Sequence, residues 1–438
     1  MSKYTKYPLS ILVLLLLLTT VTVTQGSALR DAAQQEPVTI GFVYGSFAPQ
    51  EKWELYFQGF LADHPEVTIN YIPVPLDNWG DYTQKIVTLL VGGEQVDVIW
   101  NAIEAVPMMA DRGILRELDS FIAADSDIQG YIDDVNPKLL EGLRWKDQQY
   151  LLPFAWNAPL MYYNKSVLAN AGLAEPSPDW TWDDFLEYAQ KITQDTNGDG
   201  TPDIWGFQTG FGMWDLGDWP ISNGTYWMSE DFSEPWYSKP ETIEAVQFVH
   251  DLIWKYNVAP SGDYSAAEAF AAGTLGMFGG APATREALIP AGMTPDDYDV
   301  TFWPTRNGSE THGAVWGTDG YGITQNSQHP ELAWEMVKAL VSNEVMSNLL
   351  SGQYASASAP ARNSLAADPR LVEASPAHYQ YFYDALTGGR TVVNSPIFAE
   401  LGEIHNRYLS QAWANEISVE DAMNSIQTDM EAAIAESS

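Results

Sequence analysis

The N-terminal part of the chain alternates between segments with the hydrophobic spacing of strands and segments with that of helices. Residues 38–43 and 67–72 place apolar residues at alternate positions, which predicts two strands. Residues 51–61 and 81–90 have helical spacing, and residues 97–100 predict a short buried strand. Strands that alternate with helices indicate a parallel-type α/β sheet, whose ligands collect at the carboxyl ends of its strands.

Three amphipathic helices are predicted farther along the chain. Thr181 is the expected N-cap of the first, because Asp184 three residues later completes a capping box. Pro240 and Pro330 each stand at the first turn of a segment with apolar residues at helical spacing. Residues 210–239 are rich in Gly, Trp and Asp and have no clear period, so loops are expected there.

The first 28 residues have the pattern of a signal peptide. Lys3 and Lys6 precede an apolar run at residues 9–18, and small residues at 26–28 offer a cleavage point. The apolar run is shorter than the roughly 20 residues that a membrane-spanning helix needs. We therefore expect a secreted or extracytoplasmic mature chain, in the periplasm or at the outer face of the cell membrane. An uncleaved anchor extending to Val23 is the alternative.

Composition narrows the class of protein. A chain of 438 residues exceeds what one hydrophobic core usually organises, so two lobes are expected. Cysteine is absent, which excludes disulfides, cysteine nucleophiles and the lipid-modified cysteine that tethers many exported receptors. The formal net charge of −37 repels phosphate backbones and anionic lipids, so no nucleic-acid partner is expected. We expect a monomer.

Four tryptophans beside polar residues or glycine are the candidate ligand contacts. A sugar presents hydroxyl groups and weakly apolar C–H faces, so its receptor combines aromatic planes with Asp, Asn or Glu side chains. The candidates are Trp100–Asn101, Trp156–Asn157, Trp214–Asp215, Trp316–Gly317 with nearby Asp319, and Phe278. Packing is the alternative role for the tryptophans, and turn or capping contacts are the alternative for Asn101 and Asp319.

One loop matches the first half of an EF-hand. Oxygen-bearing side chains occupy positions 1, 3, 5 and 9 of such a loop, with Gly200 at position 6. These residues are Asp195, Asn197, Asp199 and Asp203. The twelfth position is Gly206 instead of the usual Glu. The loop is thus a candidate structural Ca²⁺ site, with a metal-free Asx turn as the alternative. No cofactor is expected to be required.

Four segments of the chain, by their order and spacing, carry a family resemblance. They are residues 92–118, 150–165, 269–277 and 320–323, the last followed by the Pro330 helix and residues 359–362. In this arrangement the chain resembles the extracellular solute-binding proteins of sugar ABC transporters, the family of the maltose-binding protein. Gly276 departs from the family, which often has Ala before the Met of the third segment.

The resemblance implies a two-lobed periplasmic-binding-protein-like fold of type II, with mixed sheets flanked by helices and a three-crossing hinge. The implied crossings lie near 153–162, 311–324 and 356–364. The implied lobes are 37–153 with 325–355, and 163–310 with 365–435. The family architecture directs the candidate tryptophans at one cleft between the lobes.

The function expected is that of a non-enzymatic receptor. It captures a carbohydrate, expected to be an oligosaccharide, by lobe closure and delivers it to the permease subunits of an ABC importer. Nucleophile-elbow, phosphate-loop and paired-histidine zinc motifs are absent from the sequence. A secreted acidic glycoside hydrolase, or the same fold binding a peptide or polyamine, are the alternatives.

Overall fold

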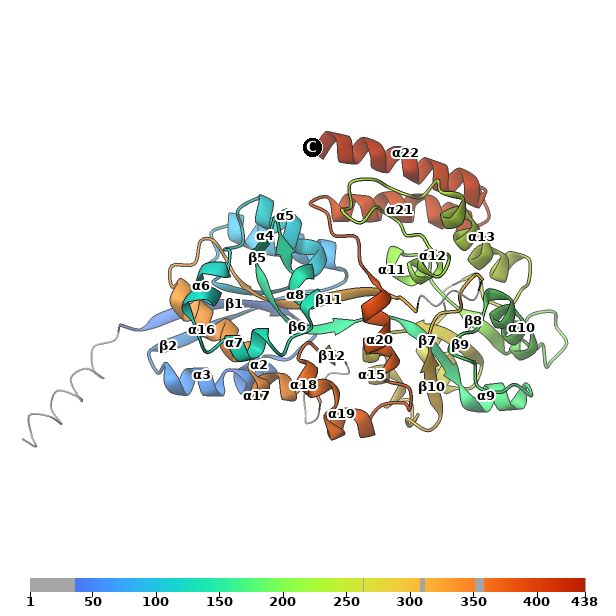
Figure 1. Cartoon of the computed structure of the whole chain (residues 1–438), viewed down its shortest axis with the longest axis horizontal. Helices are drawn as coiled ribbons and strands as arrows, with labels where there is room; N and C mark the ends of the chain where they lie inside the picture. Colours follow the sequence, from blue (N-terminus) through green and yellow to red (C-terminus); the bar gives the residue numbers. More distant parts are fainter. Residues whose placement is uncertain (1–35, 263, 308–311, 351–357, 438) are drawn as a thin grey trace, which may run out of the picture.

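Two separate β-sheets divide the chain into two lobes (Figure 1). This computed structural model describes residues 36–262, 264–307, 312–350 and 358–437, so the predicted signal peptide lies outside the described residues. The larger sheet has the strand order β12-β6-β11-β3-β1-β2, with β13 paired to β11. The smaller sheet has the order β10-β7-β9-β8.

The larger sheet is parallel at one side and antiparallel at the other. Strand β1 pairs in parallel with β2 and β3, as the alternation of strands and helices predicted. Strand β11 runs antiparallel to both β3 and β6. The strands are β1 (Val38–Gly45), β2 (Val67–Val74), β3 (Val98–Ala102), β6 (Leu151–Asn157), β11 (Val315–Ile323), β12 (Ala359–Pro360) and β13 (Arg390–Thr391). The predicted mixed α/β fold is confirmed.

The smaller sheet belongs to the second lobe. Strand β7 lies between β10 and β9 and is antiparallel to both, whereas β8 is parallel to β9. Its strands are β7 (Leu160–Asn164), β8 (Trp205–Gln208), β9 (Leu275–Gly280) and β10 (Tyr298–Thr301). Helices α21 (Phe398–Trp413) and α22 (Val419–Ser437) pack against one another and complete this lobe (Figure 1).

The predicted helices are present, with one correction. α4 (Trp79–Val91), α10 (Trp182–Ile192), α13 (Pro240–Trp254) and α16 (Pro330–Leu340) match their sequence patterns. The capping box of α10 is formed: Asp184 N donates to Thr181 Oγ1 (3.2 Å), and Thr181 N donates to the Asp184 carboxylate (2.9 Å). The single helix predicted at 51–61 is wrong: it is divided at Phe57 into α2 (Gln50–Tyr56) and α3 (Gln58–Asp63), where the fully buried Phe57 ring packs on Phe42.

The chain passes between the lobes at three places. β6 ends at Asn157 and β7 begins at Leu160, so the first passage lies within the predicted crossing. The second passage joins β10 to β11, and within the predicted crossing 311–324 residues 315–323 form strand β11, which pairs with β3 and β6. Near the predicted third crossing, β12 still pairs with β6, and the chain then continues through α20 (Tyr381–Gly388) between the lobes (Figure 1).

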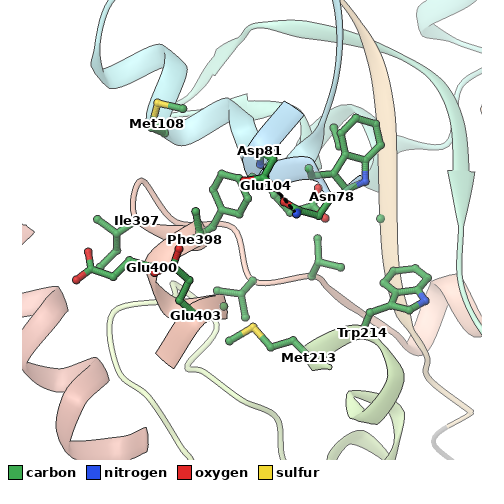
Figure 2. A pocket seen from close by; sticks show the side chains of 18 of the residues that line it. Asn78, Asp81, Glu104, Met108, Met213, Trp214, Ile397, Phe398, Glu400 and Glu403 are labelled. Carbon is green, nitrogen blue, oxygen red and sulfur yellow. Dashed lines mark hydrogen bonds between the residues drawn. The ribbon is translucent and has the colours of Figure 1, made fainter. Parts of the chain in front are cut away.

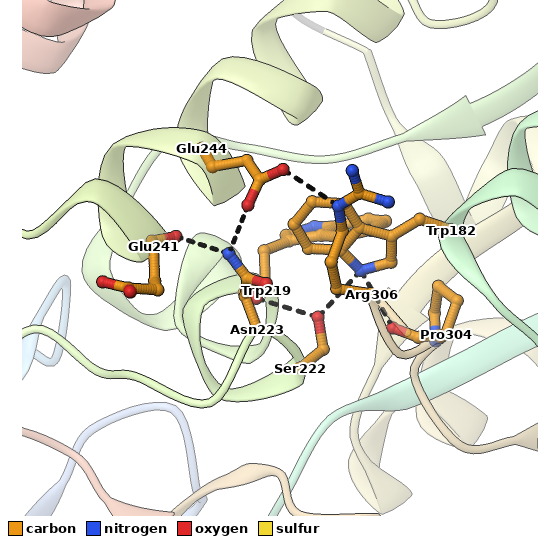
Figure 3. A network of polar contacts seen from close by, with 8 residues as sticks. All are labelled: Trp182, Trp219, Ser222, Asn223, Glu241, Glu244, Pro304 and Arg306. Carbon is orange, nitrogen blue, oxygen red and sulfur yellow. Dashed lines mark hydrogen bonds and ion pairs between the residues drawn. The ribbon is translucent and has the colours of Figure 1, made fainter. Parts of the chain in front are cut away.

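Aromatic side chains form the core of the second lobe. Trp182 and Trp219 are almost fully buried, and the Trp182 indole N–H donates to Ser222 Oγ (3.0 Å) and to Pro304 O (3.1 Å). Above this core, Arg306 Nε donates to Glu244 (2.9 Å) while its guanidinium lies over the Trp182 ring (Figure 3). Trp182 and Trp219 therefore serve packing of the second lobe.

Candidate ligand-binding site

A cavity of about 1010 Å³ lies between the two lobes (Figure 2). Its first wall comes from the N-terminus of α4, the 3₁₀ turn η1 (Ile103–Ala105) and α5 (Val106–Asp111). Its second wall comes from α11 (Met213–Leu216) and the N-terminal half of α21. The wall residues shown include Asn78, Asp81, Glu104 and Met108 on one side, and Met213, Trp214, Phe398, Glu400 and Glu403 on the other.

The floor of the cavity is built by strands of the hinge. Asn157 at the end of β6 is the register partner of Gly317 on β11, and Asp319 follows two residues later. A Cβ on Gly317 would lie 3.6 Å from Cζ3 of Trp214, so the indole of the second lobe lies directly beside the hinge strand. A ligand that fills this cavity touches both lobes and the hinge.

Two carboxylates of this site have unusual proton affinities. Burial raises the pKa of Asp319 to about 7, although the Trp100 indole N–H at 2.6 Å and the charge of Lys52 lower it in part. Burial also raises the pKa of Glu104 to about 7, and the nearby charge of Asp319 adds to this shift. Both therefore bind a proton more tightly than an ordinary carboxylate does.

A second cavity of about 450 Å³ adjoins the first within the second lobe. Trp214 lines both cavities, and the predicted residues Asp215 and Phe278 line the second one together with Trp303. The structure thus brings six predicted residues to the two cavities: Asn157, Trp214, Asp215, Phe278, Gly317 and Asp319.

The predicted position of Trp100 and Asn101 needs correction. β3 extends past Trp100 to Ala102, so both residues lie inside the sheet and not at its open end. Asn101 is fully buried, and its side-chain oxygen accepts from Ala102 N (2.8 Å) and Thr83 Oγ1 (3.3 Å). Trp100 is 8% exposed and does not line the cavity, but its indole N–H holds the Asp319 carboxylate.

Trp156 and Trp316 also lie within strands and not on the cavity wall. Trp156 is 1% exposed and meets the Tyr383 ring edge-on at 5.1 Å. Trp316 is 3% exposed; a Cβ added at Gly142 or Gly389 would lie 3.1 Å from its indole. Strand side chains alternate between faces, and these two point into the protein interior.

Several wall residues were not among the predicted site residues. Glu104 follows the buried strand β3 by two residues, so its place at a carboxyl end was a usable signal. Asn78 is the N-cap of α4, and its side-chain oxygen accepts from Asp81 N (2.9 Å) in the first turn. Glu400 and Glu403 lie on α21, far away in sequence, and only the packing of that helix brings them to the cavity.

The EF-hand-like loop forms its turn through its own hydrogen bonds. Asp195 accepts from Gly198 N (2.6 Å) and Gly200 N (2.8 Å), and the Asp203 carboxylate accepts from Thr196 N (2.7 Å). Such contacts are those of Asx turns. Among the described residues, no group of three or more His, Cys, Asp or Glu side chains is placed to hold a metal ion.

We expect excess EDTA to leave the melting temperature unchanged, because these hydrogen bonds close the loop without an ion. Thermal melts in EDTA and in millimolar Ca²⁺ measure this. A melting temperature that rises and saturates with Ca²⁺ in the wild type, but not in Asp199→Asn, would contradict the expectation and place calcium in the loop.

We expect the two cavity carboxylates to make the ligand-free protein less stable as the pH rises from about 4 to about 7. Folded Glu104 and Asp319 bind protons more tightly than the unfolded chain does, so their ionisation costs free energy of folding in this window. Buried His405 acts oppositely, because burial lowers its pKa to about 4 and its contribution is lost as the pH falls below about 6.5.

Urea unfolding across this pH range measures the effect. The double variant Glu104→Gln/Asp319→Asn should flatten the pH dependence relative to the wild type, whereas His405 and the surface charges remain the same in both proteins. An unchanged slope in the double variant would show that these two groups titrate normally.

The hinge, the two sheets and the cavity between them define a two-lobed binding protein. The sequence matches the family described as bacterial extracellular solute-binding protein over residues 44–347, and the chain belongs to this family. The family consists of binding proteins, which confirms the prediction of a non-enzymatic function. Within the part of the chain that the structure describes, no helix has the length and apolar character needed to cross a membrane.

Relatives and solved structures agree with this assignment. The chain is 24% identical over 300 residues to the maltotriose-binding protein of Pyrococcus abyssi, covering 66% of this chain but only 59% of that relative. It is 25% identical over 200 residues to the mannitol-binding protein of Pseudomonas aeruginosa, covering 45% and 43% of the two chains. The chain thus spans less than two thirds of the length of these relatives.

The fold is shared with solved binding proteins. An ABC substrate-binding protein from Listeria monocytogenes in complex with cycloalternan superposes with a TM-score of 0.78 at 19% identity, covering 91% of this chain and 99% of that one. A solute-binding protein from Thermotoga lettingae bound with α-D-tagatose gives 0.74 at 21% identity, covering 91% and 100%. These similarities establish the predicted two-lobed fold.

Proposed function

We propose that this chain is the extracytoplasmic substrate-binding subunit of an ABC importer and that its solute is an oligosaccharide. The observation that carries the proposal is the cavity between the lobes, where the Trp214 indole faces hydrogen-bonding groups such as Asn157 and Asp319. An indole covers the apolar face of a sugar ring, and the polar groups bind its hydroxyls. The two cavities that share Trp214 provide room for more than one ring.

Capture occurs by closure of the hinge. The cavity is lined from both lobes, so a ligand makes its full set of contacts only when the lobes are together. Binding therefore shifts the equilibrium between open and closed forms toward the closed one. The closed shape is what the permease recognises.

The place of action follows from the same family. We propose that residues 1–28 direct export and that the mature monomer works outside the cytoplasm, with no cysteine for lipid attachment. The maltotriose-binding relative and the cycloalternan complex support an oligosaccharide over a peptide or polyamine as the solute.

A thermal-shift screen against neutral and amine-bearing oligosaccharides of two to seven units tests this function, followed by calorimetry on the hits. We expect saturable one-to-one binding, with the sugar recovered unchanged by chromatography after incubation. Absence of any saccharide-induced shift, alongside a clear shift with a peptide or polyamine, would overturn the carbohydrate assignment. Release of new reducing ends would overturn the receptor function.

A further inference from the structure

Acidic side chains face the main cavity from both lobes and from the hinge. The acidic residues of its lining are Asp81, Glu104, Asp319, Glu400 and Glu403, whereas Arg112 is the basic one. Figure 2 shows Asp81 and Glu104 on one wall and Glu400 and Glu403 on the opposite wall. A ligand that occupies this space therefore meets negative charge from several directions.

Two acceptor atoms of the site have no donor. Glu104 Oε2 and Asn157 Oδ1 are buried, and neither accepts a hydrogen bond from any described residue. Buried acceptors without donors cost free energy, and in native proteins they call for an explanation such as a ligand. A hydroxyl group brings one donor, whereas an ammonium group brings three donors and no acceptor. An acceptor-rich wall suits the ammonium better.

The charges of Glu104 and Asp319 are also poorly compensated. Asp319 has the Trp100 indole N–H and, at longer range, the charge of Lys52, yet its pKa is still raised by burial. Keeping such carboxylates in a cleft costs stability, and groups of this kind gather at functional sites. A cation bound between them would offset the cost.

We propose that the oligosaccharide carries a protonated amine, held by the carboxylates of Glu104 and Asp319 with the Asn157 side-chain oxygen as a further acceptor. The inference rests on the proposed function, and it narrows the substrate class from sugars in general to amino sugars. Trp214 covers a ring face of the same ligand, and the exposed Glu400 and Glu403 attract the cation toward the cavity mouth.

Calorimetry with three trisaccharides of matched length tests the inference: the trimers of glucosamine, N-acetylglucosamine and glucose. At neutral pH we expect the glucosamine trimer to bind about ten- to a hundredfold more tightly than the acetylated one, as charge-assisted hydrogen bonds predict. Glu104→Gln and Asp319→Asn should each remove most of this advantage. Glu416→Gln removes one exposed charge that takes no part in the cavity lining and serves as the control.

The outcomes separate this inference from the function on which it rests. Equal or tighter binding of a neutral trimer would overturn the inference that the ligand carries an amine, and would leave the proposed function as an oligosaccharide receptor intact. Binding of the polyamine spermidine with no binding of any trimer would overturn both. An advantage for the glucosamine trimer that is lost equally in Glu416→Gln would show only a general attraction by the negative surface, and would also overturn the site. Melting curves confirm that each variant is folded.

Discussion

Replacing Trp214 with alanine is expected to weaken oligosaccharide binding by about 2 kcal/mol or more, roughly thirtyfold, while the fold is kept. Trp214 is half-buried and is the aromatic residue that lines both cavities, so its indole is placed to touch a ligand in either of them. Removing it takes away apolar cover from the sugar rings, whereas the hydrogen-bonding residues of the floor stay in place. Calorimetry with the best saccharide of the screen measures the loss.

Trp254→Ala is the matched control for this variant. Trp254 is 45% exposed on α13 and takes no part in the lining of either cavity. The Trp254→Ala variant should bind the saccharide as the wild type does. If Trp214→Ala is folded and binds with wild-type affinity, the cavity between the lobes is not the site of carbohydrate recognition.

Replacing Trp316 with alanine is expected to act on stability, lowering the free energy of unfolding by about 3–5 kcal/mol. The side chain is 3% exposed and fills the space beside Gly142 and Gly389, under the cavity floor. Alanine would leave a void where a large aromatic group now packs, and the lost contacts are not recovered elsewhere. Urea unfolding followed by circular dichroism measures the change.

Trp316→Phe distinguishes packing from a specific role of the indole. The indole N–H of Trp316 has no hydrogen-bond partner among the described residues, so phenylalanine keeps most of the packing and should cost much less than alanine. Loss of binding in a Trp316→Ala protein of unchanged stability would instead return this side chain to the ligand site, as the sequence pattern alone had indicated.

Trp214 and Trp316 show what the sequence could predict about the site and what it could not. A tryptophan beside a glycine or an acid was a sound indicator of the neighbourhood, since Gly317 and Asp319 do line the cavity next to Trp316. It did not indicate which side chain faces the ligand. In a strand successive side chains point to opposite faces, so a side chain that faces the cavity is followed by one that points into the core.

Most of the acidic residues that line the cavity were not among the predicted site residues. Glu104 lies four residues beyond the strand predicted at 97–100, near the edge where the carboxyl ends of strands meet, and sequence order was enough to suspect it. Glu400 and Glu403 reach the same cavity from α21, near the C-terminal end of the chain. Their contribution depends on contacts between parts of the chain almost 300 residues apart, which no local pattern records.

The sequence by itself determined the strands that begin the larger sheet, the helices α4, α10, α13 and α16, and the N-cap of α10, because these features depend on spacing and backbone chemistry that are local. The two-lobed fold followed from the family resemblance that the order of its segments carries. Only the tertiary structure decided which of the candidate tryptophans lines the cavity and which carboxylates gather between the lobes. Those choices follow from strand register and helix packing, where the free energy comes from contacts between distant segments.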